Sequence, residues 1–301
     1  MGWFNDIFSR GSDRPLSEKD RLNDLVKKAS FSPTAKKILD EALKKGVQFK
    51  LESGLKDRGI FEPQENTILL NKSMSDEVLL STLVHEARHA GQGLTWTSAN
   101  TLQSAFKIDR AQEADAMAFQ CAAAYELQSV YPNVFKEFRT SHPDISNAYV
   151  RSLQATKNQN MALQGAFKAW YMDTEYVASY DRSTVDFMAD KSSPARMLKD
   201  IPDTDISLKL CRNGGYSYMP DASFFNSQAA CTLKQDVYEA ASALEKKNIP
   251  IASRAGRRTS VDNFFVRQPD GRVRMPLIPR QPTAKPMTAS QISSVISGMF
   301  R

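Results

Sequence analysis

The first half of the chain contains apolar patterns typical of both helices and strands. Apolar residues recur at helical spacing in residues 17–29 and 33–45, and each segment starts at a serine suited to cap a helix. Residues 47–51 alternate between polar and apolar, and residues 67–71 form a short apolar run, as strands do. A further helix is expected to begin near Asp76, where an apolar run follows two serines. The pattern predicts a small sheet packed on helices.

The second half is predicted to be mainly helical. A segment rich in small residues opens at Asp109 and keeps helical character to Leu127. Shorter helices are expected near residues 134–139, 145–155 and 161–172, with polar loops between them. The predicted fold class is therefore α+β and mostly helical.

The same patterns divide the chain into four parts. Residues 1–16 form a short amphipathic segment, and residues 17–190 form the main domain. Residues 191–250 are an accessory part, with an irregular stretch followed by an amphipathic helix at 232–247. Residues 251–301 lack apolar periodicity and are predicted to be a flexible tail.

Charge changes this picture only at the tail. The chain carries a net charge of +6, and from residue 251 onward nine Lys/Arg face two Asp/Glu, so the tail contributes +7 and the rest −1. The nearly neutral body argues against a nucleic-acid-binding core. The tail either docks on an acidic partner or nucleic acid, or is a solvated linker, and we favour the linker.

Other sequence features bear on location. No apolar run reaches the roughly 18 residues of a membrane helix, so no membrane span is expected. The first residues lack the features of a secretory signal, and the three cysteines are far apart without a C-x-x-C pattern. We therefore expect a reduced, cytoplasmic protein, although delivery as a secreted effector is compatible with these features. The segment 1–16 would either dock on another surface or fold onto its own core, and we favour the second.

The candidate chemistry lies in the helix predicted from Asp76. His85, Glu86 and His89 form the pattern H-E-x-x-H. Residues four apart lie on one helix face, about 6 Å apart along the axis, so both imidazoles can bind one metal ion. Glu86 lies about 100° away around the helix, where a general base for a metal-bound water belongs. Because two of only three histidines have this spacing on an apolar helix, we favour a metal site over a solvated surface helix.

A catalytic zinc site needs a third protein ligand. The longer pattern H-E-x-x-H-x-x-G-x-x-H fails, because Gln92 and Thr95 stand where Gly and His would be required. His142, next to a proline in a predicted loop, is a weak candidate. Glu113 is stronger, because small residues after it would let a second helix approach the first closely.

The two motifs together resemble those of gluzincin metallopeptidases, whose third ligand is a Glu on a later helix. The segment from Glu113 to Ala116 fits E-x-x-A. With Phe119 it resembles the longer pattern E-x-x-A-x-x-F of ImmA/IrrE-type peptidases. The segment from His85 to Gln92, with this second motif, also looks like an uncharacterised bacterial metallopeptidase family. The resemblance covers roughly residues 45–180.

The resemblance implies a zincin-like metallopeptidase domain within residues 17–190. One Zn²⁺ per chain would be held by His85, His89 and Glu113, with Glu86 as the general base and a protein or peptide as the substrate. An edge strand beside the metal could hold an extended peptide by backbone pairing, and residues 47–51 and 67–71 are its candidates.

Further roles around the metal are open. Arg88, inside the motif, is either a contact to a ligand or to a substrate carboxylate, or a salt-bridge partner of an acidic neighbour. Asp109, one turn before Glu113, is a candidate for orienting a histidine N–H. Tyr171, Tyr176 and Tyr180 are candidates for stabilising an oxyanion, although aromatic residues at helical spacing are more often core.

Two other functions remain alternatives. The chain could be a catalytically inactive zincin-like interaction protein, or a protein that docks on a partner or nucleic acid through its basic tail. The sequence does not indicate the oligomeric state or the substrate.

Overall fold

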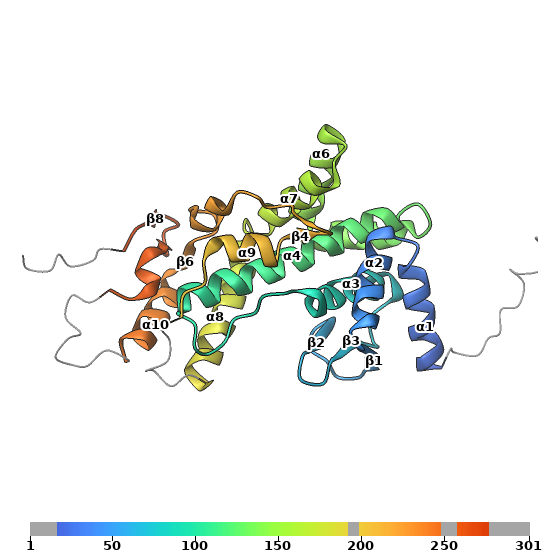
Figure 1. Cartoon of the computed structure of the whole chain (residues 1–301), viewed down its shortest axis with the longest axis horizontal. Coiled ribbons are helices and arrows are strands. Elements are labelled where there is room, and N and C mark those ends of the chain that lie inside the picture. The colour runs from blue at the N-terminus through green and yellow to red at the C-terminus, as the bar shows by residue number, and fades with distance from the viewer. Residues whose placement is uncertain (1–16, 192–198, 248–257, 277–301) are drawn as a thin grey trace, which may run out of the picture. The chain divides into compact units, whose positions relative to one another are not determined.

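The computed structural model describes residues 17–191, 199–247 and 258–276 (Figure 1). The predicted amphipathic segment 1–16 lies outside the described residues, as do the parts 251–257 and 277–301 of the predicted tail. The described residues are mostly helical and contain small sheets of two or three strands, which confirms the predicted α+β, mostly helical class. None of their helices combines the length and the apolar character that crossing a membrane requires.

The chain divides into two compact units whose segments alternate along the sequence. The described residues of the first unit lie within 17–95, 111–173 and 204–221, and those of the second within 96–110, 174–203 and 222–276. Helix α4 (Leu102–Leu127) therefore contributes residues to both units. We describe each unit by itself.

The first unit begins with the two predicted N-terminal helices. Helix α1 (Glu18–Ala29) starts after Ser17, whose hydroxyl accepts a hydrogen bond from the Asp20 N–H. Helix α2 (Pro33–Lys44) starts after Ser32, which caps it in the same way. These caps satisfy backbone donors that the first turn leaves without partners, so the predicted starts are confirmed.

A three-stranded sheet follows, in the order β1-β3-β2. Strands β1 (Gln48–Glu52) and β3 (Thr67–Asn71) pair in parallel and were both predicted. Strand β2 (Gly59–Glu62) pairs antiparallel with β3 and was not predicted, because it is short and begins at a glycine. Of the two candidates for an edge strand, 67–71 is excluded because β3 lies in the centre, and 47–51 corresponds to the edge strand β1; the second edge is β2.

Helix α3 (Asp76–Gly91), which carries the H-E-x-x-H motif, packs against β2 and β3 and against α1, α2 and α5. Every residue from Leu79 to Arg88 is buried, so the helix forms part of the core, as its apolar pattern indicated. A Cβ built on Gly59 would lie 2.8 Å from Cγ2 of Thr82 and 3.1 Å from Cγ of Glu86. The absence of a side chain at Gly59 therefore allows β2 to lie directly against α3.

Helices complete the first unit. α5 (Pro132–Ser141) and α6 (Pro143–Thr156) extend their predicted helices by one to two residues at each end, and α7 (Gln159–Trp170) begins and ends two residues before its predicted bounds. The hairpin of β4 (Arg212–Asn213) and β5 (Tyr216–Ser217) follows α9 (Asp203–Lys209), of which residues 204–209 belong to this unit.

The second unit contains α8 (Thr174–Lys191), the 3₁₀ helix η2 (Ala222–Asn226), β6 (Thr232–Lys234) and α10 (Gln235–Lys246). It also contains η4 (Ser260–Asn263), β7 (Phe265–Arg267) and β8 (Val273–Arg274). The helix predicted at 232–247 thus begins at Gln235, because residues 232–234 pair with β7.

Part of the predicted tail is folded. Residues 258–276 supply η4, β7 and β8, and Val261 and Phe264 are fully buried in one core cluster with Leu233 and Val237. Residues 258–276 lack apolar periodicity, but single apolar residues among them still belong to a core.

A Gly59→Ala substitution should lower the free energy of unfolding by about 1–3 kcal/mol, because the new methyl group must displace Thr82 or Glu86. Urea denaturation measures this change. Gly215→Ala is the matched control, since a Cβ there meets nothing within 4 Å, and it should change stability by less than about 0.5 kcal/mol. Equal effects of the two substitutions would contradict the close approach of β2 to α3.

Candidate metal centre

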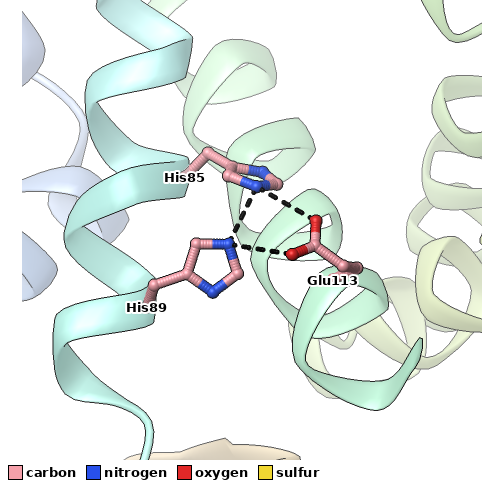
Figure 2. Close-up of side chains that lie close together, drawn as sticks. All are labelled: His85, His89 and Glu113. Carbon is pink, nitrogen blue, oxygen red and sulfur yellow. Dashed lines mark hydrogen bonds and ion pairs between the residues drawn. The ribbon is translucent and has the colours of Figure 1, made fainter. Parts of the chain in front are cut away.

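Helices α3 and α4 bring three potential metal ligands together (Figure 2). The imidazoles of His85 and His89 project from one face of α3 toward the carboxylate of Glu113 on α4. The Nε2 atoms of the two histidines are 3.0 Å apart, and they lie 3.5 and 3.4 Å from the oxygens of Glu113. Within the part of the chain that the structure describes, this is the one cluster of His, Cys, Asp or Glu side chains with metal-binding geometry.

The donor set fits a divalent metal ion. Two imidazole nitrogens and one carboxylate, with ligand atoms within 4.8 Å of one another, match a catalytic zinc site with three protein ligands. The three side chains are mostly buried, and three polar groups that converge in a buried place need a common partner. A metal ion would be such a partner.

Gln120 on α4 fixes the tautomer of His85. The hydroxyl of Ser81 donates to the Val78 carbonyl, so the Ser81 oxygen accepts from Nε2 of Gln120 at 3.1 Å. The amide oxygen of Gln120 then faces Nδ1 of His85, at 3.1 Å, and can only accept. Nδ1 therefore carries a proton, and in the neutral imidazole Nε2 presents its lone pair to the cluster.

Gln92 acts on His89 in the same way. Its Nε2 donates to the Gln112 carbonyl at 2.8 Å and to Oδ2 of Asp115 at 2.9 Å, so both amide protons are used. Its Oε1 lies 3.0 Å from Nδ1 of His89, which must donate to it. Both histidines thus donate from Nδ1 and direct Nε2 toward Glu113.

Arg88 forms a buried salt bridge. Its Nε and Nη2 bind the two oxygens of Asp115 at 2.7 and 3.0 Å, and Nη2 also donates to the carbonyls of Leu210 and Arg212. Tyr218 donates to the same carboxylate at 2.6 Å. Of the two roles left open for Arg88, the structure shows the salt bridge to an acidic neighbour, and through Asp115 this pair also holds Gln92.

Glu86 lies on the flank of α3 that faces β2. Its carboxyl group is buried and receives a hydrogen bond from the backbone of Phe61. Burial raises the pKa of Glu86 above its ordinary value, while the neighbouring imidazoles of His85 and His89 act to lower it. The carboxyl group therefore sits beside the cluster and is separate from its three converging atoms.

Residues 9–219 of the chain match the family described as "Putative metallopeptidase family (DUF6782)". The chain belongs to this family. The match is wider than the resemblance seen in residues 45–180, and it supports a metal-dependent peptidase without assigning the gluzincin or the ImmA/IrrE-like subtype. Comparison with curated proteins gives no match, and neither does comparison with solved structures.

Asp109 was expected to orient a histidine N–H, and that role stays a prediction. Asp109 belongs to the second unit, where it accepts hydrogen bonds from Nε1 of Trp96 and from the hydroxyl of Thr184, each at 3.0 Å. The Nδ1 atoms of both histidines have glutamine partners. We considered only carboxylates as partners of the histidines, so the amides of Gln92 and Gln120 were missed.

The three candidate tyrosines lie in different surroundings. Tyr171 is buried in the first unit against Phe167 and Trp170, as expected for an aromatic residue of the core. Tyr176 and Tyr180 belong to the second unit, where their hydroxyls are 3.1 Å apart. A role for any of them at an oxyanion stays a prediction.

Three further residues near the cluster were missed. Gln92 and Gln120 could have been found from helical spacing, because they lie three residues after His89 and seven after Glu113 on the same helix faces. Tyr218, about a hundred residues from Asp115 in sequence, carries no local signal.

Replacing Gln92 or Gln120 by alanine should weaken zinc binding by about 10–100-fold, because each histidine would lose the partner that fixes its tautomer. Competition with a chromophoric zinc chelator measures the affinity. Gln48→Ala, on the exposed part of β1, is the control and should leave the affinity unchanged. If the three variants bind zinc alike, the glutamines do not orient the ligands.

His142 supplies a pH dependence in the metal-free protein. Burial and the positive charges of Arg58 and His85 lower its pKa from 6.5 to about 4, against the opposite effect of Asp173. Between these values the unfolded chain binds the proton and the folded chain does not, so stability falls as the pH falls. The loss should reach about 2 kcal/mol between pH 7 and 4, allowing for the partial exposure of the ring.

Urea denaturation of the metal-free protein and of a His142→Gln variant at several pH values tests this. The variant should lose less stability than the wild type on acidification, because it lacks the titrating group. Parallel stability curves would show that His142 is not held neutral.

Proposed function

We propose that this protein is a zinc-dependent peptidase in which His85, His89 and Glu113 hold one Zn²⁺ and Glu86 is the general base. The observation that carries the proposal is the convergence of two imidazole Nε2 atoms and one carboxylate on a common point. The membership of the chain in a metallopeptidase family supports the same reaction class.

The donor set supports zinc in particular. Zn²⁺ binds imidazole nitrogen and carboxylate oxygen, and catalytic sites with three protein ligands leave a fourth position for water or substrate. Zinc bound here would lower the pKa of water toward about 7 and polarise a peptide carbonyl. His85 and His89 contribute neutral ligands because the two glutamines hold their protons on Nδ1.

Glu86 has the position of a proton carrier. It follows His85 directly and lies about 100° around the helix from it, so its carboxylate borders the cluster without joining it. The hydrogen bond from the backbone of Phe61 restrains the carboxyl group. In the proposed reaction Glu86 accepts a proton from the attacking water and delivers it to the leaving amine nitrogen.

Strand β2 supports an extended peptide as the substrate. Asn71 donates its N–H to the Arg58 carbonyl, which makes these two residues a hydrogen-bonded pair of the antiparallel ladder. Because such pairs alternate, the backbone groups of Gly59 and Phe61 point away from β3, toward the open edge of the sheet. This edge borders Glu86, and a peptide could pair with it through the Phe61 carbonyl. The substrate edge is thus proposed at β2.

Elemental analysis of the purified protein should find one zinc per chain, lost in His85→Ala and reduced in Glu113→Ala. Glu86→Gln should keep the zinc and the fold but lower peptidase activity on unfolded protein substrates by at least about 100-fold, because it removes the proton acceptor. Glu77→Gln, a matched change on the same helix outside the cluster, should retain activity.

Two results would contradict the proposal. A wild-type protein that takes up no zinc at neutral pH would favour the alternative of a zincin-like interaction protein. A Glu86→Gln variant as active as the wild type would show that any observed cleavage does not use this site.

A further inference from the structure

One part of the first unit lies on another side of α3 from Glu86. A cavity of about 430 Å³ opens between α2, the end of α3 and the β4–β5 hairpin, entirely within the first unit. Its volume is in the range of about 300–1,000 Å³ that is typical of small-molecule sites. Arg88 and Gln92 form part of its wall.

The cavity is distinct from the proposed peptide-binding edge. Arg88 and Glu86 are two residues apart on α3, and their side chains therefore point about 200° apart around the helix axis. Glu86 faces β2, whereas Arg88 faces the cavity. The metal ligands lie between these two flanks.

The cavity wall contains more basic than acidic side chains. Lys37 and Arg212 line it with exposed side chains, and no ion pair among the described residues includes either of them. Lys209 is also at the rim, paired with Asp205.

The wall contains two acidic residues, Glu41 and Glu126, against the four basic residues Lys37, Arg88, Lys209 and Arg212. The Glu126 carboxylate accepts four hydrogen bonds, from the Ser32 hydroxyl, from the N–H and the hydroxyl of Thr34, and from Gln159. It caps the N-terminus of α2 and has no lone pair left for a ligand. Glu41 is therefore the one acidic side chain of the wall that keeps its capacity to bind.

Arg88 adds a buried donor. Its side chain is about nine-tenths buried, and all four of its hydrogen bonds use Nε or Nη2. Nη1 takes part in none of these bonds among the described residues, and Arg88 borders the cavity. A guanidinium with donors left over in a buried wall is suited to an oxyanion.

We propose that this cavity binds a small ligand bearing a phosphate or carboxylate oxyanion, through Lys37, Arg212 and Nη1 of Arg88, and that its occupancy strengthens metal binding at His89. The binding part goes beyond the proposed peptidase function. The coupling part rests on that function, so the two parts are tested separately.

The coupling follows from shared hydrogen-bond partners. Oδ2 of Asp115 accepts from both Arg88 and Gln92, and Gln92 accepts from His89. An anion bound to Arg88 weakens the attraction between the guanidinium and the Asp115 carboxylate. Asp115 then becomes a stronger hydrogen-bond acceptor for Gln92. The polarised amide then makes the His89 imidazole a better ligand. By linkage, zinc must strengthen anion binding by the same factor.

Calorimetric titration of the metal-free protein with inorganic sulfate at low ionic strength tests the binding part. The double variant Lys37→Ala/Arg212→Ala should bind sulfate at least ten-fold more weakly than the wild type. The control Lys36→Ala/Lys44→Ala removes the same charge from α2 outside the cavity and should stay within two-fold. Because all four side chains are exposed, circular dichroism should show both variants folded.

Titrations with inorganic phosphate and with succinate distinguish the two sources of the oxyanion. Whichever binds more tightly, with the affinity lost in the cavity variant, identifies the class. If sulfate, phosphate and succinate all fail to bind, or if the control variant weakens binding as much as the cavity variant, the binding part is wrong.

The zinc affinity of the wild type, measured with and without saturating sulfate, tests the coupling part. Sulfate should tighten zinc binding by about five-fold in the wild type and leave it unchanged in Lys37→Ala/Arg212→Ala. Equal zinc affinities would overturn the coupling but leave the anion site standing. A protein that binds sulfate but no zinc would overturn the proposed function and the coupling, and would leave the anion site standing.

Discussion

The burial of helix α3 is the constraint on which the first unit depends. A helix packed against a sheet on one side and other helices around it must leave none of its polar side chains without a partner. His85, Glu86 and Arg88 each find a specific partner on a neighbouring element, and His89 finds one in Gln92 at the end of the helix. The polar residues therefore fix how α3 and its neighbours fit together, and the apolar residues before them supply most of the burial.

Successive residues of a helix are rotated by about 100°, so the partners of these polar side chains lie on different sides of α3. Glu86 faces the β2 flank, the two histidines face Glu113 on α4, and Arg88 faces Asp115 and the cavity wall. Glu86, the two histidines and Arg88 therefore lie on separate faces of one helix and do not compete for the same partners. Gly59 allows the first of these contacts, because any side chain there would hold β2 away from Glu86.

Much of this arrangement follows from local sequence, and the rest does not. The spacing of His85, Glu86 and His89 predicts their faces on a helix, and the Ser17 and Ser32 caps set helix starts correctly, because both depend on a few adjacent residues. Strand β2 was missed because it is short and opens at a glycine, and its role comes from pairing with β3. The contact of Tyr218 with Asp115 and the alternation of segments between two units depend on the tertiary fold, which no local pattern reports.

The choice of glutamine beside each histidine follows from charge. A bound Zn²⁺ would be balanced by the carboxylates of Glu113 and Glu86, so a carboxylate on either histidine would leave excess negative charge in a buried place. An amide oxygen accepts the Nδ1 proton equally well and adds no charge. The one carboxylate in this network, Asp115, stands one step further away and is neutralised by Arg88. An anion in the cavity would disturb that balance at Arg88, which is why the cavity and the metal centre should respond to each other.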